Sequence, residues 1–226
     1  MFENYKTFSY DFAGRPLVIE TGKMAGLANG SVLVRYGDTA VLCCATASER
    51  PRDGIDFLPL SIDFEERLYA VGRIPGSYLK REGRPSEKAI LTSRVIDRPI
   101  RPLFPKDLRN DVSIVATVMS VEQDNSPEIA AMLGAAIAIE ISDIPFNGPV
   151  TSVSVGIVDG EIVINPTVEQ RAKSILNSTI AASMDKIVMI EAGGKEVPED
   201  LMLEAILKAH EANKELCKFV KSIGEE

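Results

Sequence analysis

The sequence has no tryptophan, a single histidine and three cysteines among 226 residues. The cysteines are Cys43, Cys44 and Cys217, and an odd count that includes two neighbours does not fit a disulfide framework. One histidine rules out a multi-histidine metal site, and the cysteines lack the spacing of zinc ligands. We therefore expect a protein of a reducing, cytoplasmic compartment, with no metal bound by this chain.

Long apolar runs are also missing. No stretch reaches the roughly 18 apolar residues of a membrane span, and the N-terminus lacks the basic and apolar regions of a signal peptide. Neither a Gly-Lys-Ser/Thr phosphate loop nor a dinucleotide-binding fingerprint occurs. We expect no membrane association. The composition, 45% hydrophobic and 26% charged, is typical of a globular protein, and the length favours a single domain over residues 1–226.

Charge is distributed unevenly along the chain. The formal net charge is −8, which alone argues against a nucleic-acid-binding protein. Residues 73–109, however, hold ten basic and four acidic side chains, a net charge of +6, so the remainder carries −14. Such a cationic segment in an acidic protein attracts a polyanion to one place and repels it elsewhere.

The N-terminal third predicts antiparallel strands. Residues 31–36 and 39–47 flank Gly37-Asp38, the signal of a type I′ hairpin, and the other strand-like runs are 7–12, 16–21 and 58–64. Glycine and proline then mark a long loop over 72–85. Ser86 is a candidate N-cap for a helix that we expect to end at Asp97, before Pro99.

The rest of the chain mixes strands and helices without a regular alternation. We expect strands over 112–121, 150–158, 161–164, 178–183 and 186–191, with Asp159-Gly160 as a second hairpin turn, and helices over 128–141, 168–174 and 198–222. The helix over 128–141 is so apolar that it should be buried against a sheet. This order predicts a mixed α+β fold.

The segment most informative about function lies in the predicted loop and the helix after it. Arg94, Arg98 and Arg101 are spaced to share one helix face, and Arg81 and Arg84 precede that helix. Guanidinium groups bind phosphate oxygens in pairs of hydrogen bonds, and the ring of Tyr78 is suited to stacking on a base. The segment therefore predicts an interface for single-stranded nucleic acid.

Two other interpretations stay open on the residues alone. The arginines would also fit a solvated helix whose charges are neutralised by local ion pairs, for example with Glu87 or Asp97. Alternatively, a small α+β domain would use the same arginines to bind a phosphorylated metabolite. Affinity for a polymer falls steeply with salt and affinity for a metabolite falls little, so salt dependence separates these two ligands.

Longer motifs carry a resemblance to a known family. The runs Lys80-Arg-Glu-Gly-Arg-Pro-Ser86 and Ser93-Arg-Val-Ile-Asp-Arg-Pro-Ile-Arg-Pro-Leu-Phe104 resemble the first ribonuclease PH-like domain of the bacterial polynucleotide phosphorylases, or polyribonucleotide nucleotidyltransferases. Arg35-Tyr-Gly-Asp-Thr39 and Ile144-Pro-Phe-Asn-Gly-Pro149 match the same family, in the same order. The resemblance implies a ribonuclease PH-like fold and a role in phosphate-dependent 3′-to-5′ RNA degradation, a step of mRNA turnover. A free-standing paralogue that needs a partner chain would carry the same motifs.

The resemblance also implies residue roles. Tyr78, Leu79, Lys80 and Arg81 fall on the family's Phe-Phe-Arg-Arg loop, which grips single-stranded RNA, although the second aromatic ring is absent here. Arg84, Arg94, Arg98 and Arg101 match arginines that hold RNA or support phosphorolysis beside the active site. The implied partners are single-stranded RNA, a second ribonuclease PH-like domain of the same subunit, and two further subunits of a homotrimer. No DNA specificity is expected.

Two features of the competent family repeat are missing from this chain. Where that repeat has a Gly/Ser-rich phosphate turn, this sequence reads Asn125-Ser-Pro-Glu128, and where it has paired aspartates, residues 178–184 hold no acid. Proline lacks an N–H donor, and Glu128 brings negative charge to an anion-binding helix terminus. The resemblance thus implies a catalytically incomplete N-terminal part of a longer chain, with Mg²⁺ and phosphate bound outside it.

Overall fold

A six-stranded sheet occupies the N-terminal half of the protein in the computed structural model, which describes residues 4–225. Its strands lie in the order β1-β2-β3-β4-β6-β5. Their bounds are β1 (Lys6–Phe12), β2 (Arg15–Thr21), β3 (Gly30–Tyr36), β4 (Thr39–Pro51), β5 (Leu60–Glu65) and β6 (Asn110–Ser120). Neighbours are antiparallel except β5 and β6, which run parallel, so the prediction of a purely antiparallel N-terminal third is wrong at β5. The reason is the long crossover between β5 and β6, which contains a helix and lets the chain return in the same direction.

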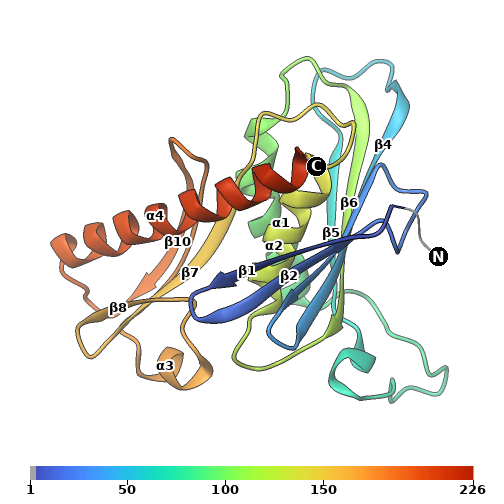
Figure 1. Ribbon diagram of the computed structural model, residues 1–226. Coiled ribbons are helices and arrows are strands. Elements are labelled where there is room, and N and C mark those ends of the chain that lie inside the picture. The colour runs from blue at the N-terminus through green and yellow to red at the C-terminus, as the bar shows by residue number, and fades with distance from the viewer. Residues whose placement is uncertain (1–3, 226) are drawn as a thin grey trace.

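A four-stranded sheet follows, in the order β10-β9-β7-β8. Its strands are β7 (Thr151–Val158), β8 (Glu161–Ile164), β9 (Leu176–Ala182) and β10 (Ile187–Gly194), all antiparallel to their neighbours. The short helix α3 (Val168–Lys173) connects β8 to β9, and the long helix α4 (Glu199–Gly224) runs across the second sheet towards β1 (Figure 1). These elements confirm the predicted α+β class. Among the described helices, none has the length and apolar character that crossing a membrane demands.

The two predicted hairpin turns differ in geometry. Asp159 and Gly160 both have positive φ, of 51° and 83°, as a type I′ turn requires. At the first turn Gly37 has a φ of 57°, but Asp38 is not among the residues with positive φ. The hairpin prediction is confirmed at both places, and the type I′ assignment is wrong at Gly37-Asp38, where the Asp38 amide instead donates to the Glu122 carboxylate at 3.0 Å.

Helix α2 (Pro127–Glu140) lies between the two sheets (Figure 1) and is buried from Ile129 to Ile139. Alanine and glycine on this helix allow strands to approach closely, and a Cβ added at Gly134 would lie 2.5 Å from the sulfur of Cys43. One cluster of buried hydrophobic side chains includes residues of both sheets and of α2. The predicted burial of this helix is confirmed.

Helix α1 (Glu87–Ile100) begins where the sequence predicted. The Ser86 hydroxyl accepts a hydrogen bond from the Ala89 amide at 3.0 Å, so Ser86 is the N-cap. The predicted end at Asp97 is wrong, because the helix continues through Pro99 to Ile100. Pro99 and Ile100 are buried, and the Arg101 amide still donates to the Asp97 carbonyl beyond the proline. Packing therefore compensates for the one hydrogen bond that the proline removes.

Candidate functional site

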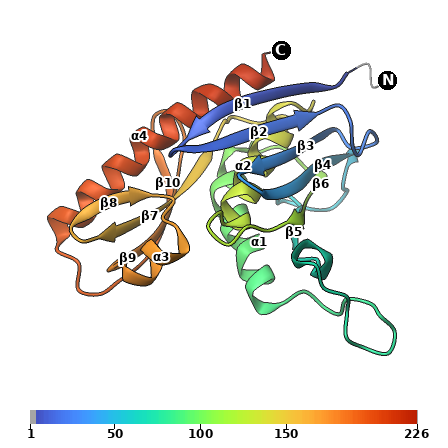
Figure 2. The same cartoon turned by 60° about the horizontal axis from the view of Figure 1, so that its bottom comes forward.

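The loop over residues 72–85 projects from the body of the protein at the β5 edge (Figures 1 and 2). It follows a short 3₁₀ helix, η1 (Leu68–Val71), and contains no regular element, as predicted. Tyr78 and Leu79 at its tip are 98% and 71% exposed. These two side chains are not packed against the rest of the protein, so their apolar surfaces are available to a ligand.

The backbone of the loop forms a tight turn at this tip. The Lys80 amide donates to the Ser77 carbonyl at 3.0 Å, and Lys80 has a φ of 48°. The side chains of Lys80, Arg81 and Arg84 are exposed, and none has a hydrogen-bond or ion-pair partner among residues 4–225. The turn therefore presents one aromatic ring and three free cations to solvent.

The arginines of α1 are held differently from those of the loop. Arg98 pairs with Glu191 of β10 at 3.0 Å and stays 60% exposed. Arg101 binds both carboxylate oxygens of Asp97, at 2.7 and 2.9 Å, and donates to the carbonyls of Leu58 and Leu60. Arg94 is exposed and has no partner in the described part of the chain. Local ion pairs thus account for Arg98 and Arg101 but not for Arg94 or the loop cations.

An open cavity of about 910 Å³ lies beside the loop, between α1, the start of α2 and the strands of the second sheet. Glu66, Arg67 and Leu68, which precede the loop, form part of its wall. Asn177 and Thr179 of β9 and Glu191 of β10 line the opposite side. None of the eight predicted site residues is among the described residues that line this cavity. Glu191, the ion-pair partner of Arg98, does line it.

The floor of the cavity contains a carboxylate at the N-terminus of α2. Glu128 is in the first helical turn, pairs with Lys88 of α1 at 2.6 Å and accepts a hydrogen bond from the Ser126 hydroxyl. Burial raises the pKa of Glu128, but the hydrogen bonds from Lys88 and Ser126 outweigh it and hold the pKa below the ordinary 4.5. The hydrogen bond to Glu128 correspondingly raises the pKa of Lys88. The N-terminus of α2, a position that favours a bound anion, is therefore occupied by the Glu128 carboxylate of the same chain.

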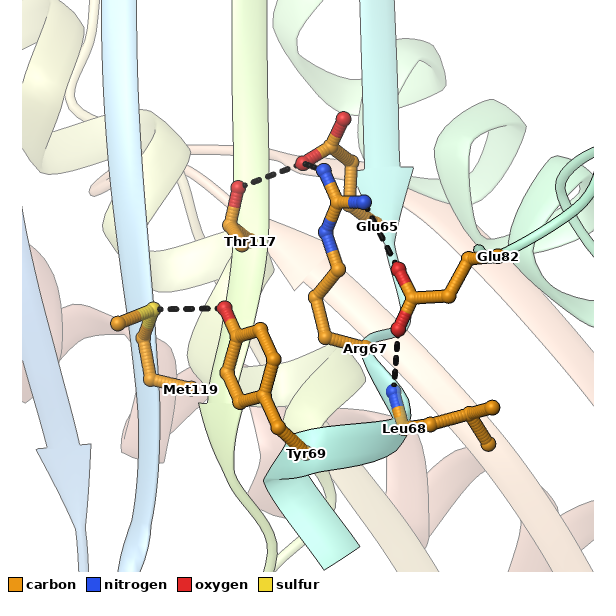
Figure 3. A network of polar contacts seen from close by, with 7 residues as sticks. All are labelled: Glu65, Arg67, Leu68, Tyr69, Glu82, Thr117 and Met119. Atoms are coloured by element: carbon orange, nitrogen blue, oxygen red, sulfur yellow. Dashed lines mark hydrogen bonds and ion pairs between the residues drawn. The ribbon is translucent and has the colours of Figure 1, made fainter. Parts of the chain in front are cut away.

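A polar network connects the base of the loop to the sheet (Figure 3). Glu82 accepts hydrogen bonds from the Arg67 guanidinium at 2.8 Å and from the Leu68 amide at 2.7 Å. Arg67 also binds Glu65 at 2.6 Å, and the Thr117 hydroxyl donates to the same oxygen of Glu65 at 3.0 Å. The hydrogen bonds from Arg67 and Leu68 lower the pKa of Glu82, so its carboxylate is ionised at neutral pH.

Sequence reasoning identified the exposed tip but missed Arg67, Glu82 and Lys88 as site residues. Arg67 lies outside the cationic segment of residues 73–109, and Glu82 and Lys88 were interpreted only as contributions to the net charge of that segment. The one signal in the sequence was position, since Arg67 comes shortly before the glycine- and proline-rich loop and Glu82 lies near the end of it. Within residues 4–225, no group of three or more histidine, cysteine, aspartate or glutamate side chains is placed to hold a metal ion.

Comparison with known sequences identifies relatives over the whole chain. Residues 13–145 match the profile of the 3′ exoribonuclease family, domain 1, and residues 148–212 match the profile of domain 2 of the same family. The chain is 67% identical over 222 residues to a polyribonucleotide nucleotidyltransferase of Ruminiclostridium cellulolyticum, covering 98% of this chain and 32% of the relative. A polyribonucleotide nucleotidyltransferase of Clostridioides difficile is 59% identical, over 99% of this chain and 32% of its own length. The chain thus spans about a third of the length of these curated relatives.

The fold also has a solved counterpart. The structure of Rrp46 from rice superposes with a TM-score of 0.72, covering 99% of this chain and 96% of the rice chain, at 13% sequence identity. At that identity the likeness concerns the fold alone, and it confirms the predicted ribonuclease PH-like architecture. The two matched profiles meet near residue 146, between α2 and β7. The assignment of residues 1–226 to a single domain stays a prediction.

Proposed function

The chain belongs to the 3′ exoribonuclease family, and we propose that it is the RNA-holding first core domain of a polyribonucleotide nucleotidyltransferase. The observation that carries this proposal is the loop tip, where a fully exposed Tyr78 stands beside the unpaired cations of Lys80 and Arg81. A ring for base stacking and cations for phosphates are the two components of sequence-tolerant single-strand binding. Arg84 and Arg94, also without partners within residues 4–225, extend the cationic surface.

The other members of the predicted site take supporting roles in this proposal. Leu79, 71% exposed, offers an apolar contact beside the ring. Arg98 and Arg101 are already bound to Glu191 and to Asp97, so they offer fewer free N–H groups to a phosphate than Arg94 does. We propose that Arg94 and the loop contribute most of the phosphate contacts, and that Arg98 and Arg101 line the same face.

The whole protein that this proposal implies degrades RNA from the 3′ end with phosphate as the attacking group. We propose that a second ribonuclease PH-like domain of the same subunit supplies the phosphate site and the Mg²⁺ site, because Glu128 occupies the α2 terminus here. The proposed assembly is a homotrimer in the cytoplasm that surrounds single-stranded RNA. In this arrangement the present chain binds and orients RNA, and reaction chemistry takes place at the partner domain.

A salt titration of RNA binding tests the proposal. Binding of poly(A) by the complete gene product is measured from low to moderate salt for wild type, Arg81→Ala, Arg94→Ala and Tyr78→Ala. Each arginine variant should weaken binding of every sequence about equally and flatten the log–log salt slope by about 0.7. Tyr78→Ala should cost about 1–3 kcal/mol with an unchanged slope, because stacking releases no counterions.

The same series detects the rival ligand. If only a phosphorylated metabolite binds, affinity for poly(A) is absent and the salt dependence of metabolite binding is shallow. If both arginine variants leave RNA affinity and the salt slope at wild-type values, the cationic surface is merely solvated and the proposal is wrong. Arg52→Ala is a matched control, since Arg52 is an exposed arginine outside this surface that pairs with Asp111.

A further inference from the structure

The loop that carries Tyr78 and Arg81 is closed at its base by a carboxylate. Glu82 follows Arg81 directly, and its two oxygens accept from Arg67 and from the Leu68 amide, at 2.8 and 2.7 Å. Leu68 opens the 3₁₀ turn before the loop, so these contacts join the two ends of a segment of about 14 residues. Because both oxygens are used, the carboxylate has little freedom to rotate away.

The other side of this contact is fixed to the sheet. Arg67 is held by Glu65 at the end of β5, and Glu65 accepts from Thr117 of β6, its partner in the parallel register (Figure 3). The Tyr69 hydroxyl contacts the sulfur of Met119, also on β6, at 3.4 Å. The guanidinium therefore has carboxylates on two sides and cannot follow a moving loop without leaving Glu65.

A second contact fixes the start of the following helix. The hydroxyl of Ser86, the N-cap of α1, donates to the Glu66 carboxylate at 2.6 Å. Adjacent residues, Glu66 and Arg67, thus hold Ser86 and Glu82 respectively. The chain is therefore held on the C-terminal side of the exposed tip at two places, Glu82 and Ser86.

We infer that Arg67 and Glu82 form a clamp that positions the loop tip for RNA, an inference that rests on the proposed function of that tip. Glu82 is one residue from Arg81, so the clamp fixes where the Arg81 cation and the neighbouring Tyr78 ring stand before RNA arrives. A loop ordered in advance loses less conformational entropy on binding and binds more tightly. Arg67 and Glu82 are positioning residues in this account, since neither needs to touch RNA.

The clamp makes a prediction opposite to that of simple electrostatics. Removal of a negative charge from a cationic surface should strengthen polyanion binding. Loss of the clamp should weaken it, because the loop then samples many conformations. Glu82→Gln removes the charge and keeps a hydrogen-bond acceptor for the Leu68 amide, and Glu82→Ala removes both. Glu87→Gln is the matched control, since Glu87 is an exposed carboxylate nearby that has no partner within residues 4–225.

The experiment compares these variants and Arg67→Gln in the complete gene product, using poly(A) affinity, its salt slope, and amide hydrogen exchange of residues 72–85. We expect Glu82→Ala to weaken RNA binding by about tenfold, with faster exchange in the loop and an unchanged salt slope. Glu82→Gln should give a smaller loss in the same direction. Glu87→Gln should bind RNA as tightly as wild type or more tightly. The double variant Arg67→Gln/Glu82→Gln should bind RNA no more weakly than the more affected single variant, because either single change already breaks the Arg67–Glu82 ion pair.

The outcomes separate this inference from the function on which it rests. If Arg81→Ala weakens binding and both Glu82 variants bind RNA as tightly as wild type or more tightly, the clamp is wrong and the proposed function stands. If loop exchange is unchanged in Glu82→Ala, the clamp is wrong whatever the RNA affinity. If Arg81→Ala and Tyr78→Ala leave RNA binding unchanged, the proposed function fails, and loop exchange alone reports whether Glu82 holds the loop. Thermal unfolding of Glu82→Gln checks that the variant is folded.

Discussion

Lys88 of α1 and Glu128 of α2 form an ion pair of 2.6 Å that joins the two helices at the floor of the cavity. The side chain of Lys88 is 65% exposed and that of Glu128 only 24% exposed, so the two partners differ in burial. Loss of the lysine leaves a largely buried carboxylate with the Ser126 hydroxyl as its remaining side-chain partner. The pair therefore contributes to stability mainly by compensating the burial of Glu128.

Lys88→Met should destabilise the protein at neutral pH and much less in acid. The pKa of Glu128 is lowered in the folded protein, so its contribution is complete above 4.5, its ordinary value, and is lost as pH falls through the lowered pKa. The pKa of Lys88 is raised in the folded protein, so its contribution is complete below pH 10.5, its ordinary value, and is lost as pH rises through the raised pKa. We expect Lys88→Met to lower the free energy of unfolding by about 1 kcal/mol at pH 7. The effect is small because solvent screens the exposed lysine side chain.

Urea unfolding of wild type and Lys88→Met at several pH values checks this expectation. The difference between the two proteins should shrink as pH falls below 4.5, because a protonated Glu128 no longer needs a cation. Lys218→Met is the control, since Lys218 pairs with Glu215 on the exposed face of α4 and should change stability little. A difference that stays constant with pH would contradict the role of the ion pair.

Arg101→Ala should mainly lower stability, whereas Arg94→Ala should mainly weaken RNA binding. Arg101 connects α1 to the carbonyl of Leu58, before β5, and to that of Leu60, the first residue of β5, so its removal should lower the free energy of unfolding by about 1–3 kcal/mol. Arg94 has no partner within residues 4–225, and its removal should change that free energy by less than about 0.5 kcal/mol. In RNA binding, Arg94→Ala should have the larger effect.

Denaturant unfolding and RNA titration of the same two purified variants provide the measurement. Arg101→Lys is a useful companion variant, because lysine keeps the charge but cannot bind Asp97 and two carbonyls with one planar group. It should therefore be almost as destabilised as Arg101→Ala. Equal stabilities of all three variants and wild type would show that the Arg101 contacts contribute nothing measurable.

Gly134→Ala should destabilise the protein through packing alone. A Cβ at Gly134 would lie 2.5 Å from the Cys43 sulfur and 2.9 Å from a methyl group of Val34, so α2 or the strands must shift. Overpacking of this kind costs about 1–3 kcal/mol. Gly83→Ala is the control, because nothing lies within 4 Å of a Cβ added there and Gly83 is not among the residues with positive φ. Thermal unfolding should separate the two variants clearly, and equal midpoints would contradict the packing argument.

Local patterns predicted most elements of the fold, and the errors arose where distant segments interact. Alternating strands, the Asp159-Gly160 turn and the Ser86 cap are set by residues within a few positions, and the structure has each of them. The parallel pairing of β5 with β6 depends on a crossover, which the strand pattern does not encode. The continuation of α1 through Pro99 depends on burial of Pro99 and Ile100 against other elements.

The candidate site divides in the same way. The exposure of Tyr78 and Leu79 follows from a glycine- and proline-rich segment, and sequence reasoning found them. The contacts of Glu82 with Arg67 and of Lys88 with Glu128 join residues 15 and 40 positions apart. Many carboxylates lie within such distances of each cation in the sequence. Only the tertiary arrangement selects the actual partners, so these pairs were outside the reach of sequence patterns.

The last prediction concerns catalysis by the 226-residue chain alone. The N-terminus of α2, where an anion would gain from the helix dipole, begins at Pro127 without an N–H and holds the Glu128 carboxylate. Inorganic phosphate would meet a negative charge there, so we expect no phosphate-dependent release of ADP from poly(A). Incubation of the purified chain with poly(A), phosphate and Mg²⁺, followed by chromatography of nucleotides, measures this.

The complete gene product, for which we propose this activity, is assayed in parallel as the positive control for substrate and conditions. A chain with Pro127→Gly and Glu128→Ser tests whether the tethered carboxylate alone blocks phosphate, since these changes restore an N–H and remove the charge. We expect this variant to remain inactive as well, because residues 178–184 on and after β9 supply no carboxylate for proton transfer. Sustained ADP release by the unmodified chain, in a preparation free of host enzyme, would mean that this chain has its own active site and would contradict the proposed division of roles.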